Sequence, residues 1–306
     1  MDIPTTPGTT TPARTAAAAL IQRIALVGML LFTLLAPPAS AADTPLLLVH
    51  GYGASGTGKD CNGDIWKDAL AYYQSAGGRS RASMTTIGYY PGDKSRCDAM
   101  IGDGDAGNDR PIQDIARDLA HYVDRLDAPV DVIGHSMGGL IVRVALLGSA
   151  QGWEGFPKGK LDVDNVVTLS TPHQGVASPG AHDDEQWRQM RPGSGFLERM
   201  AQNGLGDAWA EGTDWTLIGS REDATVSHAS GIDKGAPADE KLGYRPADDA
   251  DKVIHTGVRT LRGADGYALT YWHASGAHPP HETSDGWSPL KAAFQAATHV
   301  GDNLPR

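Results

Sequence analysis

A serine flanked by glycines is the clearest chemical feature of the sequence. The segment Gly134-His135-Ser136-Met137-Gly138 follows the largely apolar run Val130–Ile133 and precedes a second apolar stretch, Leu140–Leu147. When such a serine lies at the sharp turn between a buried strand and a helix, the strained backbone exposes its hydroxyl. The helix N-terminus then favours developing negative charge. The sequence therefore predicts that Ser136 is a nucleophile.

A nucleophilic serine requires a histidine base, and the base requires an orienting carboxylate. When the serine lies on a strand-to-helix turn of this kind, the expected order along the chain is serine, acid, histidine. Asp223 follows the apolar run Trp215–Ile218 and is the predicted acid, with Glu222 as the alternative.

Three histidines near the C-terminus compete for the role of the base. His281 lies closest to the helix start at Ser288-Pro289 and is the predicted base, with His278 as its competitor. His255 precedes the last predicted strand and is therefore disfavoured. A metal site built from His273, His278 and His281 is also disfavoured, because no cysteine or acidic motif accompanies them.

The turn His50-Gly51-Tyr52-Gly53 provides the second chemical signal, since it follows the apolar run Leu46–Val49. Acyl transfer passes through a tetrahedral oxyanion that needs two preset N–H donors. We assign these donors to the backbone amides of Tyr52 and of Met137, which follows the nucleophile.

Apolar runs and amphipathic segments alternate along the chain and predict the elements that position these residues. The predicted helices begin near Asp64, at Pro111, near Leu140 and at Ser288. The predicted strands are Leu46–Val49, Thr85–Tyr90, Val130–Ile133, Val166–Leu169, Trp215–Ile218 and Ala268–Trp272. This alternation predicts an α/β fold with a mainly parallel sheet covered by helices on both faces.

Two polar regions interrupt the alternation. Residues 175–212 are Gly-rich and partly helical, and we expect them to form a small cap or lid over the site. The stretch Gly231–Lys252 is rich in Asp, Pro and Lys and is interpreted as a solvated excursion before the last strands.

The first 41 residues have the pattern of a signal peptide. Arg14 and Arg23 precede the apolar run Ile24–Ala36, and the small-residue motif Ala39-Ser40-Ala41 predicts cleavage after Ala41. The run is shorter than the roughly 20 residues that span a bilayer, which disfavours a membrane anchor. We therefore expect a secreted protein whose single α/β domain covers residues 42–306.

Charge and cysteine content narrow the partners and the compartment. The 26 basic and 37 acidic residues give a formal net charge of −11, and no basic stripe occurs, so nucleic acid is disfavoured as a partner. The two cysteines, Cys61 and Cys97, are predicted to form a disulfide in an exported chain. Such a bridge would stabilise the fold by roughly 3–4 kcal/mol.

At these residues the sequence resembles the α/β-hydrolase superfamily and, within it, secreted bacterial lipases and esterases. The resemblance is carried by Leu46–Gly53, by Val132–Gly139, by the segment Val166–Gly175 that contains Thr171-Pro172-His173-Gln174-Gly175, and by Met190–Leu197. It implies an α/β-hydrolase fold and hydrolysis of carboxylic esters of lipids through an acyl-enzyme, with no organic cofactor and no predicted metal. A lipase would also contact lipid interfaces transiently. A short-chain esterase or polyester depolymerase is the alternative, and thioesterase or acyltransferase activity is more remote.

Overall fold

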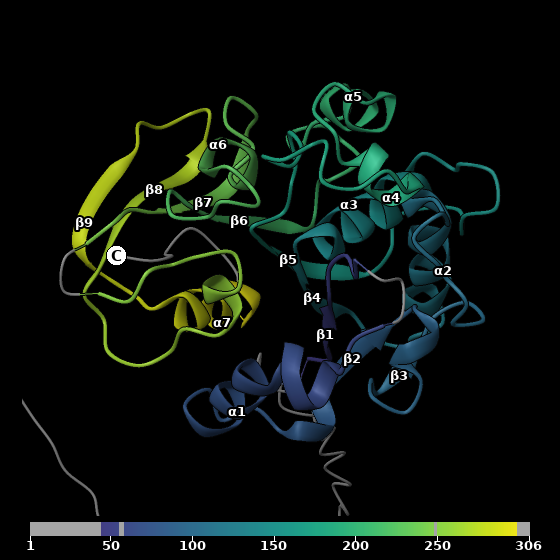
Figure 1. Ribbon diagram of the computed structural model, residues 1–306, viewed down its shortest axis with the longest axis horizontal. Helices are drawn as coiled ribbons and strands as arrows, with labels where there is room; N and C mark the ends of the chain where they lie inside the picture. Colours follow the sequence, from purple (N-terminus) through teal and green to yellow (C-terminus); the bar gives the residue numbers. More distant parts are fainter. Residues whose placement is uncertain (1–43, 55–57, 248–249, 299–306) are drawn as a thin grey trace, which may run out of the picture. The chain divides into compact units, whose positions relative to one another are not determined.

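A nine-stranded, mostly parallel sheet forms the centre of the computed structural model, which describes residues 44–54, 58–247 and 250–298 (Figure 1). The strand order is β3-β2-β1-β4-β5-β6-β7-β8-β9. The strands are β1 (Leu46–Val49), β2 (Met84–Gly88), β3 (Ala99–Met100), β4 (Val130–His135), β5 (Val163–Leu169), β6 (Asp214–Ser220), β7 (Ala238–Tyr244), β8 (Tyr267–Ser275) and β9 (His281–Gly286). Pairing is parallel from β3 through β7, and β8 and β9 add an antiparallel edge.

Strand β1 shows why the parallel strands are almost wholly apolar. Leu46 and Leu48 belong to one buried cluster, whereas Leu47 and Val49 belong to the other. Because successive side chains of a strand point to opposite faces, both faces of the sheet are covered. This confirms the predicted two-sided core.

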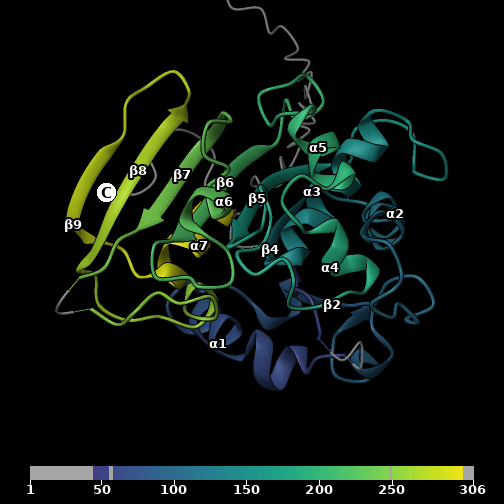
Figure 2. The same cartoon turned by 45° about the horizontal axis from the view of Figure 1, so that its top comes forward.

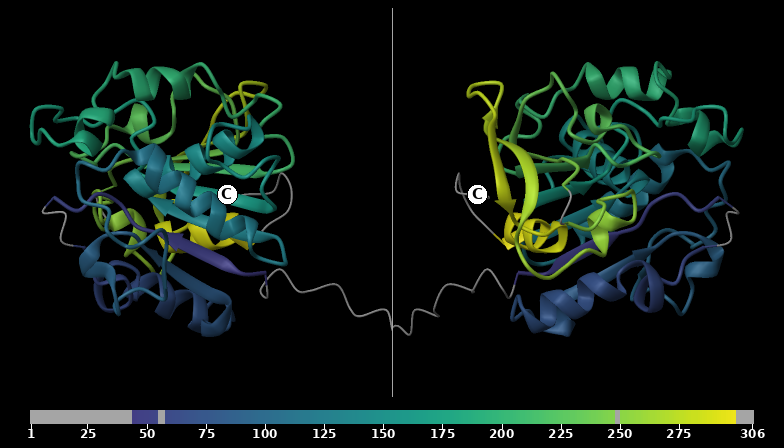
Figure 3. Two further views of the ribbon diagram at one scale, coloured as in Figure 1. Left: turned by 90° about the vertical axis from the view of Figure 1, so that its right-hand side faces the viewer. Right: turned by 60° about the vertical axis from the view of Figure 1, so that its left-hand side comes forward.

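Helices cover the two faces in pairs. The helices α2 (Ile112–Asp124) and α3 (Met137–Ala150) contribute to the cluster on the Leu47 face, and α1 (Lys67–Ser75) and α7 (Pro289–Thr298) to that on the Leu46 face. On the second face, the rings of Tyr73 and Phe294 join α1 to α7 at 5.0 Å between centroids. The side views of Figure 3 show α1 in blue and α7 in yellow. Short helical turns complete the fold: η1 (Cys61–Ile65), η2 (Arg81–Ser83), η3 (Pro91–Asp93) and η4 (Gly257–Arg259).

The predicted cap region contains two short helices, α4 (Glu185–Gln189) and α5 (Gly195–Ala201). Each begins at a capping side chain, because Asp184 accepts from the amide of Trp187 and Ser194 accepts from the amide of Leu197. The segment buries a set of large apolar side chains in the Leu47-face cluster: Trp187, Met190, Phe196, Leu197, Met200, Leu205 and Trp209. Residues 175–212 therefore have an apolar core in common with α2 and α3.

The prediction of a solvated excursion over Gly231–Lys252 is wrong for its central part. Helix α6 (His228–Gly231) leads into β7, whose residues Glu240 and Lys241 are almost fully buried. Consecutive charged residues, which include Glu240 and Lys241, interrupt any apolar pattern, so the sequence does not reveal this strand as buried. The chain then returns as the antiparallel pair β8 and β9, which lie beside β7 in Figure 2.

The described residues all lie within one compact unit, Pro38–Arg306. The predicted signal peptide, with its cleavage site after Ala41, lies outside the described residues. Among the described helices, none is both long and apolar enough to span a bilayer.

Candidate active site

Ser136 occupies the turn between β4 and α3 with a backbone conformation that few side chains adopt. Its φ is 55° and its ψ is −129°. The strained residue is held by hydrogen bonds on both sides: its amide donates to the carbonyl of Leu169 at 2.8 Å, and its carbonyl accepts from the amide of Gly139 at 3.1 Å. Strained backbone that surrounding hydrogen bonds hold in place is typical of functional positions. The predicted strand-to-helix turn at Ser136 is therefore present, and its role as a nucleophile stays a prediction.

Close backbone packing explains the glycines beside the serine. A Cβ on Gly138 would lie 2.3 Å from the carbonyl oxygen of Val49, and a Cβ on Gly51 would lie 2.7 Å from the Cβ of Ser136. Glycine is thus required at both positions, because any side chain would separate the turn after β1 from the turn after β4. This packing brings the predicted oxyanion loop directly against the serine.

Asp223 lies in the loop after β6 and is bonded to a histidine. Its Oδ1 accepts from the amides of Thr225 and Val226 at 2.8 and 2.9 Å, and its Oδ2 lies 2.8 Å from Nδ1 of His255. Burial alone would raise the pKa of Asp223, but the hydrogen bond and charge of His255 outweigh it and hold the pKa below the ordinary value. Asp223 is therefore ionised at neutral pH and orients the His255 ring.

The structure does not bring the predicted bases, His281 and His278, to Asp223. His281 begins β9, is exposed and stacks on Tyr271 at 5.3 Å between ring centroids. His278 is exposed in the turn that joins β8 to β9. The pairing of Asp223 with either histidine is wrong, because both lie on the antiparallel edge, whereas Asp223 lies at the end of a parallel strand.

The sequence disfavours His255 because it does not reveal β7 as a strand. Once β7 is recognised as the last parallel strand, His255 is the histidine that follows it. The carboxyl ends of parallel strands meet at one edge of the sheet. Ser136 after β4, Asp223 after β6 and His255 after β7 therefore converge there, and the cavity at Ser136 is lined by both Ser136 and His255.

Two neighbours hold the loop that carries His255. The ring of His135 packs against that of His255 at 4.8 Å between centroids, and its Nε2 lies 2.9 Å from the His255 carbonyl oxygen. Burial lowers the pKa of His135 well below its ordinary value, so its neutral ring donates this hydrogen bond. Glu222, the alternative acid, instead accepts from the amide of Val253 at 3.0 Å. Both contacts therefore fix the loop that carries His255.

The amides assigned to the oxyanion hole occupy suitable positions. Met137 is the first residue of α3, and Tyr52 lies in the loop packed against Ser136. Among the hydrogen bonds between described residues, neither amide acts as a donor. Both N–H groups are thus unpaired within the part of the chain that the structure describes.

A buried network fixes the loop that carries Tyr52. His50 Nε2 lies 3.0 Å from Oδ2 of Asp93, and the same oxygen accepts from the amides of Tyr89 and Tyr90 at 2.8 Å each. The hydroxyl of Tyr89 donates to the carbonyls of His50 and Gly51 at 2.8 and 2.9 Å. The loop conformation is therefore set by the interior and not by solvent.

The side chain of Tyr52 joins this loop to the predicted cap. Its hydroxyl donates to Asp184 at 2.5 Å, and its ring lies 5.1 Å from that of Trp187. Burial, reinforced by the bond to Asp184, raises the pKa of Tyr52 far above its ordinary value. The phenol therefore stays protonated and acts as a link between residues 175–212 and the site.

The segment around His173 has a structural function in this chain. The guanidinium of Arg143 donates to His173 Nδ1 at 3.2 Å and to Asp233 at 3.0 Å, and His173 Nε2 lies 3.1 Å from the hydroxyl of Thr168. Burial lowers the pKa of His173 to about 3, so the ring is neutral and its Nε2–H donates to Thr168. These bonds fix the segment after β5 to α3 and to the loop that carries Asp233.

Two cavities differ in their relation to Ser136. The cavity at the serine has a volume of about 130 Å³. A larger cavity of about 660 Å³ is lined by Arg143, His173 and Asp233 but by none of Ser136, Asp223 and His255. A space of about 130 Å³ equals roughly four water molecules. The serine therefore opens onto the smaller space.

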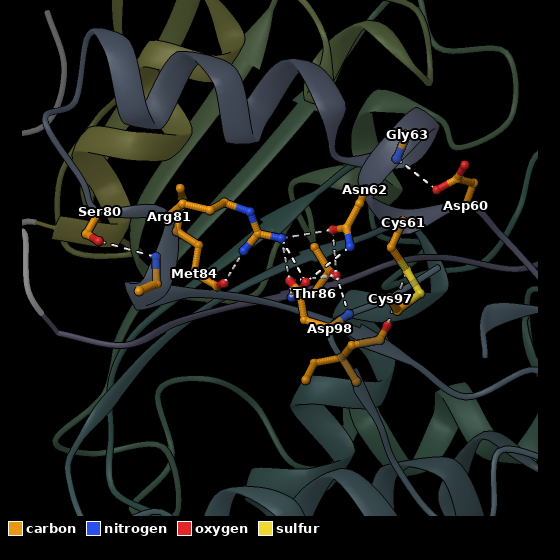
Figure 4. Close-up of polar contacts among 12 residues, drawn as sticks. Asp60, Cys61, Asn62, Gly63, Ser80, Arg81, Met84, Thr86, Cys97 and Asp98 are labelled. Carbon is orange, nitrogen blue, oxygen red and sulfur yellow. Dashed lines mark hydrogen bonds and ion pairs between the residues drawn. A yellow bond between two sulfur atoms is a disulfide. The ribbon is translucent and has the colours of Figure 1, made fainter. Parts of the chain in front are cut away.

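A disulfide between Cys61 and Cys97 confirms the predicted pairing (Figure 4). It joins η1 to the segment between η3 and β3. Beside it, the guanidinium of Arg81 donates to Asp98 at 2.8 Å, and Asp98 accepts from the amide of Thr86 at 2.9 Å. Figure 4 shows these side chains gathered around the bridge. His50 with the two cysteines is the one metal-like group found among the described residues, and its sulfurs are already bonded to each other.

A mostly parallel sheet with a strained serine on the turn after β4, an acid after β6 and a histidine after β7 defines the α/β-hydrolase fold. The predicted fold class is therefore confirmed. A family model described as a PGAP1-like alpha/beta domain matches residues 41–190, just under half of the chain. This match contains the oxyanion loop and the serine turn, and it supports the resemblance to the α/β-hydrolase superfamily.

Comparison with solved structures gives distant neighbours. The mature form of the Bacillus licheniformis lipase BlEst2 is 16% identical with a TM-score of 0.42, over 62% of this chain and 79% of the lipase. The Legionella pneumophila phospholipase PlaB is 15% identical with a TM-score of 0.44, over 68% and 47% of the two chains. Aspergillus fumigatus lipase B is 17% identical with a TM-score of 0.41, over 64% and 42%. No curated protein sequence matches this chain significantly. The activities in these names describe the neighbours alone.

Proposed function

We propose that this chain hydrolyses carboxylic esters through a covalent acyl-enzyme, with Ser136 as nucleophile, His255 as base and Asp223 as the orienting acid. The observation that carries the proposal is the 2.8 Å contact between Asp223 and Nδ1 of His255 in a loop that lines the Ser136 cavity. With its Nδ1–H bound to the carboxylate, the ring directs Nε2 as a proton acceptor.

The mechanism follows from these positions. Nε2 of His255 removes the Ser136 proton as the hydroxyl oxygen attacks the ester carbonyl, and the amides of Tyr52 and Met137 stabilise the oxyanion. The imidazolium, stabilised by Asp223, then protonates the departing alcohol. Water, activated by the same imidazole, attacks the acyl-enzyme and releases the carboxylic acid. Each turnover thus consumes one water molecule and breaks one C–O bond.

The small cavity favours short acyl groups over long ones. A volume of about 130 Å³ lies below the roughly 300 Å³ at which pockets for drug-sized ligands begin. This favours an esterase for short esters over a triacylglycerol lipase, which remains the second candidate because of the resemblance in sequence. Secretion after cleavage at Ala41, and a cap formed by residues 175–212, complete the proposal.

Replacement of the serine tests the proposal directly. We expect Ser136→Ala to lower turnover of p-nitrophenyl butyrate by about 10⁴-fold or more, with an unchanged circular dichroism spectrum. The matched control is Ser149→Ala in the same helix, because Ser149 is buried and its hydroxyl has no partner among the described residues. The nucleophile assignment is wrong if the Ser136 variant retains activity.

Chain-length dependence separates the two candidates. We expect the rate on soluble esters to peak at short acyl chains and to show no jump when a longer ester exceeds its solubility limit. A sharp increase at the droplet interface would instead identify a lipase.

A further inference from the structure

The cavity at Ser136 is cationic, although the chain is acidic overall. Its charged lining consists of Lys59 and Arg259, beside the imidazoles of His135 and His255, and no carboxylate lines it among the described residues. The formal net charge of the whole chain is −11. Two cations around the reacting serine therefore contrast with the rest of the molecule.

Arg259 is a buried cation that forms no ion pair with any described carboxylate. It is 7% exposed, its Nη1 donates to the carbonyl of Ile65, and its Nε has no partner among the described residues. Burial lowers its pKa, and the carboxylates of Asp64 and Asp68 act on it only through longer-range attraction, since neither forms an ion pair with it. An unpaired buried charge is costly, so such a guanidinium is expected to have a function.

The other buried arginines show that this arrangement is not general in the chain. Arg79 lies 3.2 Å from Asp131, and Arg143 lies 3.0 Å from Asp233. Each neutralises its charge with a carboxylate from another element. Arg259, which lines the reactive cavity, lacks this internal partner, and an anion in that cavity would supply it.

We propose that the preferred substrates are carboxylic esters that carry an anionic oxygen group, a carboxylate or a phosphate, close to the scissile bond. The inference rests on the proposed hydrolase function. The anionic group lies between Arg259 and Lys59 while the ester carbonyl is presented to Ser136. A guanidinium binds either anion strongly, and a small cavity with little water strengthens the pairing. The anion itself is not changed during turnover.

Matched substrates test this specificity. On the acyl side, the pair is p-nitrophenyl hexanoate and the mono-p-nitrophenyl ester of adipic acid, which differ by a terminal carboxylate. On the alcohol side, the pair is glycerol monobutyrate and its 3-phosphate. Hydrolysis of these two esters is measured as released butyrate. We expect higher kcat/KM for the charged member of at least one pair, and the pair that responds identifies which part of the substrate carries the anion.

Variants assign the preference to the two cations. We expect Arg259→Gln to lower kcat/KM for the preferred anionic ester by about 30-fold or more, mainly through KM, because it removes a buried charge partner. The uncharged member of the pair should change by less than about threefold. Lys59→Gln, at a half-buried position, should also lower kcat/KM for the anionic ester, by about two- to fivefold. Arg262→Gln is the matched control, because Arg262 is nearby in sequence, exposed and absent from the cavity.

The outcomes separate this inference from the function on which it rests. If the native protein hydrolyses uncharged esters through Ser136 but shows no preference in either pair, the anion site is wrong and the hydrolase stands. If no ester is turned over, the proposed function is wrong. If Arg259→Gln and Lys59→Gln lower both members of a pair equally, the two cations are structural. If Arg259→Gln does not fold, the effect of Lys59→Gln and the substrate preference of the native protein still test the anion site.

Discussion

Two regions of this molecule hold a histidine against a carboxylate with almost the same geometry, yet we assign catalysis to only one. At the carboxyl edge of the parallel strands, His255 Nδ1 lies 2.8 Å from Asp223. On the antiparallel edge, His273 Nδ1 lies 2.8 Å from Glu240, directly opposite it in the register of β7 and β8. Both rings are oriented by a carboxylate, so the pair by itself does not define a base.

The surroundings of each ring make the difference. His255 lines a cavity together with a serine held at positive φ, and its loop is fixed by His135 and Glu222. His273 is a cross-strand neighbour within a sheet, where an oriented charged pair stabilises pairing. The edge of the sheet at which a strand ends therefore determines whether a histidine that follows it lies near Ser136.

Removal of each histidine in turn should give the largest contrast. We expect His255→Ala to lower kcat on a p-nitrophenyl ester by about 10⁴- to 10⁶-fold, because the serine loses its base. His273→Ala, His278→Ala and His281→Ala should retain kcat within a few-fold. The measurement is kcat with folding checked by circular dichroism. A loss of kcat confined to His281→Ala or His278→Ala would instead support the base predicted from the sequence.

Removal of charge from each acid sharpens the same comparison. We expect Asp223→Asn to lower kcat by about 10⁴-fold, because an amide in place of the carboxylate no longer stabilises the imidazolium and favours the wrong tautomer. Glu240→Gln is the matched change in the other pair and should leave kcat nearly unchanged while it lowers the melting temperature. Equal losses of kcat in both variants would contradict the assignment.

The sequence predicts those parts of the candidate site that lie within one short stretch of chain. The turn at Ser136 follows from an apolar strand, flanking glycines and an apolar helix, all within a short stretch. Asp223 follows an apolar strand in the same way. These patterns are local because strands buried on both faces must be apolar.

The contact between His255 and Asp223 could not be predicted, because the strand that precedes His255 has no apolar pattern. In β7, Glu240 and Lys241 are both 2% exposed, and their charges are satisfied by tertiary partners that no local pattern reveals. Lys241, for example, donates to the carbonyl of Asp233 at 2.8 Å. Without β7, the sequence places the last strand at Ala268–Trp272 and favours the histidines that follow it, which lie on the antiparallel edge.

A third pair, His50 with Asp93, extends the comparison to stability. Both side chains are fully buried behind the oxyanion loop. Burial alone would raise the pKa of Asp93, but the bond and charge of His50 and several backbone amides hold it below the ordinary value of 3.8. The folded state therefore binds a proton at Asp93 less readily than the unfolded state does. This contribution to stability is complete above pH 3.8 and is lost as pH decreases through the folded-state pKa.

Substitution of Asp93 should therefore have a moderate effect that depends on pH. We expect Asp93→Asn to lower the free energy of unfolding by about 2–4 kcal/mol at pH 7, because the buried amides and His50 lose a charged acceptor. The difference in stability from the native protein should narrow as pH decreases from 5 to 3, since the unfolded carboxyl takes up a proton at higher pH than the folded one. Urea unfolding at several pH values measures this, and Asp103→Asn in an exposed turn is the control. A difference that stays constant with pH would show that Asp93 contributes through its shape and not its charge. In that case the charge of the His50–Asp93 pair would contribute nothing to stability, in contrast to the proposed role of charge in the His255–Asp223 pair.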